Sequence, residues 1–329
     1  RGLCITAFRA RPPNRIAMPG KKVKLRRKKR EILVSLLFFL NREQKLAVDR
    51  WLRGRKEFRE IRKADFVIVS PPKSGRTWLR TMLSRFFQHR FGLPENELLG
   101  YDNYHRMNPA VPRIRFSHDR YVNLYTGNRD SKRDFYDKKV VLMVRDPRDV
   151  VASNYFQWIN CVNPYKKKLL NIPDRPEETP IFEYAMTQQF GIPRTVNFLR
   201  AWAPEIDKTR AHLLIRYEDM RRETAPVLKE LLAFMGFEAS DEEIRQIVEE
   251  TSFENMKKLE KEQAFSSDGS GSRRLMVKDP DNPESFKVRR GKVGGYTDYF
   301  SEQELEEIDR LIEQIPALYG YAPRSTAGG

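Results

Sequence analysis

Three short, continuous apolar runs mark the chain: "FVIVS" at residues 66–70, "KVVLMV" at 139–144 and "AHLLIRYE" at 211–218. Each run is followed by sequence with the spacing of a helix. Strands that are apolar on both faces and alternate with helices are typical of a parallel sheet covered on both sides. The pattern predicts an α/β fold with a central parallel sheet flanked by helices, and ligands of such sheets bind at the carboxyl ends of the strands.

The polar segments predict how the rest of the chain is organised. Residues 31–63 are charged with helical spacing, so residues 1–63 should form a basic leader and a helix ahead of a domain at 64–320. Residues 260–290 are rich in Ser, Gly, Asp and Pro and lack periodicity, which predicts a mobile lid. Ser301 and Glu304 form a capping box that predicts a final helix.

Composition and charge narrow the classes of function. The chain is 40% hydrophobic and 33% charged, as expected of a soluble globular protein, and its formal net charge of +17 favours anionic ligands. Cys4 and Cys161 give neither a disulfide framework nor the spacing of metal ligands. With four histidines and no Cys/His cluster, we expect no structural zinc site.

The leader contains a strongly basic run. Eight of residues 21–30 are Lys or Arg, and the apolar run that follows, at 32–40, is too short to span a bilayer. Met18 is a candidate start of the chain. Two interpretations stay open: a basic amphipathic segment that contacts an anionic membrane surface, and a solvated tail that leads into an ordinary helix. Both agree with a cytoplasmic protein, which in the first case is peripheral on the membrane.

The first apolar run leads into a candidate phosphate loop, "SPPKSGRTW". A strand, a short loop with glycine and a helix offer backbone N–H groups to an anion, and Lys73, Ser74 and Thr77 add a charge and two hydroxyls. In the loop of nucleoside triphosphatases the lysine follows the glycines. Here Lys73 precedes Gly75, so the loop is too short to wrap a triphosphate in the usual way. A plain strand-to-helix turn is the alternative.

The second apolar run ends in "VRDPRDVVAS". Asp146 stands where a kinase would place a magnesium-binding carboxylate. Arg145, Arg148 and Ser153 suit a phosphate monoester better, because guanidinium groups donate two parallel hydrogen bonds to phosphate oxygens. Asp146 and Asp149 also fit a simpler role as caps on the first turn of the next helix.

Taken together, these motifs resemble the sulfotransferases that use 3′-phosphoadenosine 5′-phosphosulfate (PAPS). The family motif P-K-S-G-T-T-W corresponds to residues 72–78, and R-N-P-K-D followed by Ser corresponds to residues 145–149 with Ser153. "YEDM" at 217–220, "TSF" at 251–253 and "RRGKVG" at 289–294 match further family motifs. The matches occur in family order across about residues 65–315.

The resemblance implies a P-loop-like sulfotransferase fold, PAPS as co-substrate, no metal, and a role for each matched residue. The 5′-phosphosulfate would be held by the backbone of Ser74, Gly75, Arg76 and Thr77. Adenine would be held by Trp78, Phe253 and Tyr217, with Thr251 in the same motif as Phe253. The 3′-phosphate would be held by Arg145, Ser153, Arg289, Arg290 and Gly291. Lys73 would stabilise the leaving oxygen, with Ser153 also in the catalytic set. "PRIRFSHDR" resembles P-R-x-x-K-T-H, which makes His118 the catalytic base.

Three departures from the family pattern are visible. Phe116 replaces the lysine two positions before the histidine, and Arg76 replaces the first threonine of the T-T pair. "GGYTDYF" stands where many members have G-D-W-K-N-x-F, with Gly295 and Tyr296 in place of Asp and Trp. The first departure removes a cation expected near the acceptor. The second keeps the backbone amide and puts a guanidinium either near the phosphosulfate or out in solvent.

The leading hypothesis is therefore a PAPS-dependent sulfotransferase. A nucleotide or small-molecule kinase with a degenerate phosphate loop is one alternative, and a non-catalytic polyanion-binding protein is another. We expect a small-molecule, lipid or carbohydrate acceptor and no nucleic acid. The acceptor pocket should come from residues 91–125, 155–180 and 260–290, including the aromatic tract at 100–113.

Overall fold

The structure is a computed structural model that describes residues 32, 34, 36–162, 164–172, 178–265, 275, 277, 279 and 281–324. The basic run at 21–30 and residues 266–274 of the predicted lid lie outside this range, so the membrane contact and the lid mobility stay predictions. Among the described residues, no helix is long and apolar enough to cross a membrane.

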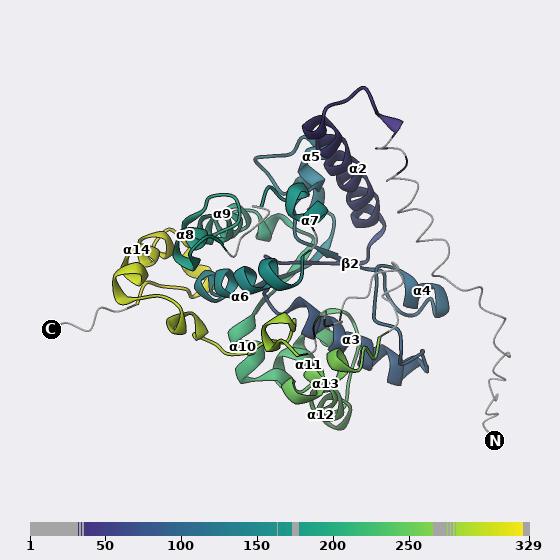
Figure 1. Ribbon diagram of the computed structural model, residues 1–329. Coiled ribbons are helices and arrows are strands. Elements are labelled where there is room, and N and C mark those ends of the chain that lie inside the picture. The colour runs from purple at the N-terminus through teal and green to yellow at the C-terminus, as the bar shows by residue number, and fades with distance from the viewer. Residues whose placement is uncertain are drawn as a thin grey trace, which may run out of the picture.

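The core is one sheet of four parallel strands in the order β2-β1-β3-β4. The strands are β1 (Phe66–Val69), β2 (Ile114–Ser117), β3 (Lys139–Val144) and β4 (Ala211–Arg216). Helices cover both faces (Figure 1), so the predicted α/β fold with a central parallel sheet is confirmed. β2 was not predicted, because "IRFS" is only four residues long and Arg115 interrupts its apolar pattern.

The helices alternate with the strands along the chain. They are α2 (Arg42–Lys63), α3 (Arg76–Phe91), α4 (Asn103–Met107), α5 (Val122–Thr126), α6 (Pro147–Asn160), α7 (Pro164–Leu169), α8 (Ile181–Met186), α9 (Ile192–Trp202), α10 (Tyr217–Arg222), α11 (Thr224–Phe234), α12 (Asp241–Glu250), α13 (Phe253–Lys261) and α14 (Glu302–Ile312). The capping box of Ser301 and Glu304 precedes α14, as predicted.

Alternating side chains of each strand face two separate apolar cores. Val67 and Val69 belong to one core, which includes α6, α9 and α14, whereas Phe66 and Ile68 belong to the other, with α3, α11 and α12. Successive residues of a strand point to opposite faces, so a run that is apolar at every position must be covered on both. This explains why β1 is apolar at every position and β3 at every position after Lys139.

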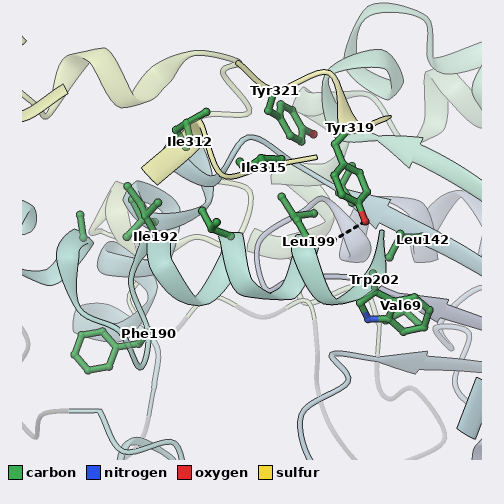
Figure 2. Close-up of a cluster of buried hydrophobic side chains, with 14 of the residues drawn as sticks. Val69, Leu142, Phe190, Ile192, Leu199, Trp202, Ile312, Ile315, Tyr319 and Tyr321 are labelled. Atoms are coloured by element: carbon green, nitrogen blue, oxygen red, sulfur yellow. Dashed lines mark hydrogen bonds between the residues drawn. The ribbon is translucent and has the colours of Figure 1, made fainter. Parts of the chain in front are cut away.

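Helix α9 packs against the first core with one face. Leu199 and Trp202 are fully buried, and the hydroxyl of Tyr319 donates a 2.9 Å hydrogen bond to the Leu199 carbonyl (Figure 2). The indole N–H of Trp202 donates to Asp119, which follows β2. These contacts fix α9 against the carboxyl end of β2.

The register of the sheet brings four strand ends to one edge. Val69 pairs with Ser117 on one side and Leu142 on the other, and Val144 pairs with Arg216. The residues that follow the four strands are Ser70, His118, Arg145 and Tyr217. Three of these four were predicted to be functional, and the fourth, Ser70, begins the phosphate loop.

Candidate active site

The loop after β1 has the backbone of an anion site. Lys73 and Gly75 adopt positive φ angles of 65° and 84°, and α3 begins directly after Gly75. A Cβ atom at Gly75 would lie 2.6 Å from the ring of Tyr217, so a glycine is required there. The first-turn amides of α3 have no acceptor within the helix and are available to an anion.

The side chains of this loop are prepared for a charged ligand. Burial lowers the pKa of Lys73 to about 8, since the ammonium has lost much of its hydration. The hydroxyl of Ser74 is buried and finds no hydrogen-bond partner in the described part of the chain. A buried donor of this kind is costly unless a ligand satisfies it.

His118 lies beside this loop with its two ring nitrogens in distinct roles. Nδ1 is 2.8 Å from the carbonyl of Ser70, and Nε2 is 2.5 Å from Nη2 of Arg76. A carbonyl only accepts, so Nδ1 carries the proton and Nε2 presents its lone pair. The parallel pairing of β1 with β2 places Ser70 and His118 side by side. The arrangement fixes the tautomer that a general base needs at Nε2.

Arg76 is the cation nearest to this imidazole. Its Nη1 donates a 2.8 Å hydrogen bond to the carbonyl of Ser117, and its Nη2 donates to His118. Burial, together with the positive charges of Arg76 and Arg120, holds the pKa of His118 well below its ordinary range. His118 is therefore neutral at physiological pH.

Phe116, which stands in the place of the family lysine, contributes no charge to the site. Its ring is buried and covered by the guanidinium of Arg80, whose carbon lies 3.6 Å from the ring centroid. The side chain of Arg76 instead reaches the backbone of the adjacent Ser117.

Arg145 connects two segments that are far apart in sequence. Its guanidinium donates to the carbonyl of Lys73 at 3.1 Å and to that of Lys292 at 3.0 Å, and it pairs with Asp149 at 3.3 Å. Its Nε is buried and has no partner among the described residues. The phosphate loop and the late glycine-containing loop therefore meet at Arg145.

The two aspartates after β3 have different roles. Asp146 caps α6 by accepting from the amide of Arg148 at 2.9 Å, as predicted. Asp149 lies in the first turn of α6, as predicted, but its carboxylate accepts from the amides of Gly294 and Tyr296 and not from an amide of the helix. Asp149 thus anchors the late loop. The side chain of Arg148 binds both oxygens of Asp146, which leaves this carboxylate poorly suited to the magnesium role of a kinase.

The late loop reaches the site through its glycine. Gly291 has a φ of 61°, and a Cβ there would lie 2.8 Å from the ring of Phe253. Arg289 and Arg290 carry ion pairs instead of open donors, with Glu284 at 2.8 Å and Asp298 at 2.7 Å, respectively. The structure therefore brings Gly291 to the site. To bind a phosphate, Arg289 and Arg290 would first have to release Glu284 and Asp298.

The predicted adenine residues lie together. The indole N–H of Trp78 donates a 2.8 Å hydrogen bond to the carbonyl of Thr251, and its ring meets Tyr217 edge-on, with centroids 6.3 Å apart. Phe253 begins α13 two residues after Thr251, and Ser153 is half-buried in the second turn of α6. Trp78 therefore contacts Thr251 and Tyr217, and Phe253 follows Thr251 closely in the chain.

A cavity of about 210 Å³ opens beside His118. Pro71 and Pro72 of the phosphate loop line one side, and residues of α6 and α9 line the other. Residues 118–120, Trp158 and Ile172 come from the predicted acceptor segments, whereas no described residue of the tract at 100–113 lines the cavity.

Sequence reasoning missed the contribution of α9, from Arg194 to Ala201. Arg194, Phe198 and Ala201 recur at helical spacing on a face different from that of Leu199 and Trp202, and this second face was the available signal. In the part of the chain that the structure describes, no group of three His, Cys, Asp or Glu residues could hold a metal ion.

Comparison with known proteins gives one family. The family described as "Sulfotransferase domain" matches residues 63–320. Cytosolic sulfotransferase 12 of Arabidopsis thaliana is 26% identical over 279 residues, covering 78% of each chain. Flavonol 3-sulfotransferase of Flaveria bidentis is 26% identical over 291 residues, which cover 80% of this chain and 86% of the relative.

The fold is shared with a solved structure. Mouse sulfotransferase SULT7A1, solved in complex with PAP, has a TM-score of 0.52 and 20% identity, and the match covers 77% of this chain and 84% of that one. The predicted sulfotransferase fold is thereby confirmed.

The state of His118 can be tested by NMR. The imidazole of His118 should stay neutral at pH values where an ordinary histidine is protonated, because burial and the charge of Arg76 hold its pKa well below the ordinary value. Arg76→Met removes a positive neighbour and should raise this pKa measurably. Long-range 1H–15N spectra, with the His118→Gln variant for assignment, give the titration.

Arg200→Met, at an exposed position on α9, is the control and should leave the titration unchanged. A His118 pKa near 6.5 in the unmodified protein, or no response to Arg76→Met, would show that Arg76 does not govern this histidine.

Proposed function

Because the chain belongs to the sulfotransferase family, we propose that it transfers a sulfuryl group from PAPS to a hydroxyl or amine of a small-molecule, lipid or carbohydrate acceptor. The observation that carries the proposal is the meeting of three segments at the carboxyl edge of the sheet. The phosphate loop and the Gly291 loop are joined through Arg145, and His118 lies beside them. Neither a kinase nor a polyanion-binding protein requires this combination.

The residues present fit a nucleotide that carries phosphate at both ends. The amides from Ser74 to Thr77 and the buried Ser74 hydroxyl would hold the 5′ end. Nε of Arg145 and the Gly291 amide would hold the 3′-phosphate, with Ser153 nearby. Arg289 and Arg290 would join once the phosphate displaces Glu284 and Asp298, since a phosphate dianion competes well for guanidinium groups.

Bound PAPS would supply an activated sulfuryl group and a phosphate leaving group. Lys73 would stabilise the charge that develops on the bridging oxygen, since it lies in the loop just before the start of α3 and carries a positive charge. Positive side chains and amides suffice for this electrostatic role, and we expect no metal.

His118 would act as the general base at the acceptor. Ser70 holds the proton on Nδ1, so the lone pair of Nε2 would accept the proton of the acceptor hydroxyl as the new bond forms, once the guanidinium of Arg76 has left Nε2. The cavity beside His118 would receive the acceptor.

Arg76 would occupy Nε2 of His118, and so keep the base inactive, until the donor binds. Its guanidinium lies on Nε2 of His118 in the ligand-free protein, and the phosphosulfate would offer it an anionic partner instead of a neutral one. Movement of Arg76 onto the donor would expose Nε2 to the acceptor. Arg76 would then also supply the positive charge that the family lysine supplies at the position of Phe116.

A cytoplasmic location stays a prediction, as does contact with an anionic membrane. The named acceptor of one relative, a flavonol, supports a small molecule as acceptor in this protein.

Ligand-dependent melting tests the nucleotide site. Adenosine 3′,5′-bisphosphate (PAP) without magnesium should raise Tm by several degrees, because a ligand at about 100 times its Kd contributes about 2.7 kcal/mol to the free energy of unfolding. ATP with magnesium should raise it much less, since it lacks the 3′-phosphate. Scanning calorimetry measures both. Stabilisation by ATP with magnesium alone would contradict the proposal and favour a kinase.

The pH dependence of turnover tests Lys73. Since the pKa of Lys73 is about 8, kcat/KM for PAPS should fall about tenfold per pH unit above that value, as the free enzyme loses the charged ammonium. In the Lys73→Arg variant the fall should move to higher pH, because a guanidinium keeps its proton. A profile that is flat to pH 10, or a fall that Lys73→Arg does not move, would exclude Lys73 from this role.

A further inference from the structure

The cavity beside His118 carries more positive charge than its walls neutralise. Its charged lining residues are Asp119, Arg120, Lys132 and Arg194. Lys132 and Asp119 form a closed pair with an N–O distance of 2.7 Å, and Asp119 also accepts from Trp202. These two charges cancel, which leaves the two arginines.

Neither arginine has a carboxylate partner in the described part of the chain. Nε of Arg120 is buried and receives no hydrogen-bond acceptor there. Arg194 donates from Nη1 to the carbonyl of Gln189 at 2.7 Å, which is a neutral partner. Glu57, the carboxylate whose charge acts on Arg120, is already bound by the Ser117 hydroxyl and paired with Arg115.

The two guanidinium groups also repel each other. Burial and the charge of Arg120 lower the pKa of Arg194 to about 10, and burial likewise lowers the pKa of Arg120. Two partly buried cations that repel each other cost free energy, and unfavourable arrangements of this kind cluster at ligand sites. An anion between them would reduce the repulsion and give Nε of Arg120 an acceptor.

We propose that the acceptor carries an anionic oxygen group, a carboxylate or a phosphate or sulfate ester, which binds Arg120 and Arg194 while its hydroxyl lies at His118. This inference rests on the proposed function and assigns the substrate class of the same site. Guanidinium groups bind carboxylates and phosphate or sulfate esters alike through two parallel hydrogen bonds. The two arginines would therefore select acceptors by their negative charge. Neutral acceptors of the same shape would leave both half-buried arginines without a counter-charge.

Paired hydroxy compounds that differ only in the anionic group test the inference. The pairs are 4-hydroxyphenylacetate with 4-hydroxyphenylacetamide, 6-hydroxyhexanoate with 6-hydroxyhexanamide, and glycerol 3-phosphate with glycerol. Their Kd values are measured by calorimetry on the full chain, both free and saturated with PAP. At least one anionic member should bind the PAP-saturated protein about tenfold or more tightly than its neutral partner, as charge-assisted hydrogen bonds predict.

Three variants locate the effect. Arg194→Gln and Arg120→Gln should each reduce the preference for the anion toward onefold, and Arg194→Lys should retain part of it because the charge remains. Arg200→Gln, an exposed arginine on the same helix, is the matched control and should leave the preference unchanged. Retained PAP binding shows that each variant is folded.

The outcomes separate this inference from the proposed function. Equal binding of anionic and neutral members, or no binding of any anionic member, contradicts the inference even if PAP binds. A preference that persists in both Gln variants places the anion elsewhere and also contradicts it. If the free protein prefers the anionic compounds and the PAP-saturated protein does not, Arg120 and Arg194 bind the donor, which contradicts the inference. If PAP itself fails to bind, the proposed function fails. The measurements on the free protein then still test whether the cavity binds the anionic compounds more tightly than the neutral ones.

Discussion

The site depends on the parallel register between β1 and β2. Because Val69 pairs with Ser117, the residues after these strands emerge side by side, and the Ser70 carbonyl fixes the proton of His118 on Nδ1. A slip of one residue would turn the imidazole to the other face of the sheet. The tautomer of the proposed base is thus set by backbone geometry, whereas many enzymes orient such a histidine with a carboxylate.

Several partly desolvated cations also lie at this edge of the sheet. Burial and the charge of Arg145 lower the pKa of Lys73, and burial together with the charges of Arg76 and Arg120 lowers the pKa of His118. Such an arrangement weakens the fold and favours anionic ligands. In the proposed reaction, the donor would satisfy the loop and Arg145, and the acceptor would satisfy Arg120 and its neighbour on α9.

Much of this arrangement could be predicted from the sequence. The apolar strands, the phosphate loop and its place beside Arg145 followed from local patterns and motif order. The missing parts depend on tertiary contacts. β2 is too short and too charged to recognise, Asp149 has the appearance of a helix cap but binds the amide of Gly294, and the face of α9 with Arg194 becomes relevant only when the helix packs beside His118. The guanidinium of Arg76 likewise found its partner only in the folded chain.

Removal of the imidazole tests the central claim most directly. In the His118→Ala variant, single-turnover transfer from PAPS should fall by about 10² to 10⁴, the contribution of a general base, while the Kd for PAP changes little. His212→Ala, at the opposite end of the sheet on β4, should leave both quantities unchanged. An unchanged transfer rate in His118→Ala would contradict the account.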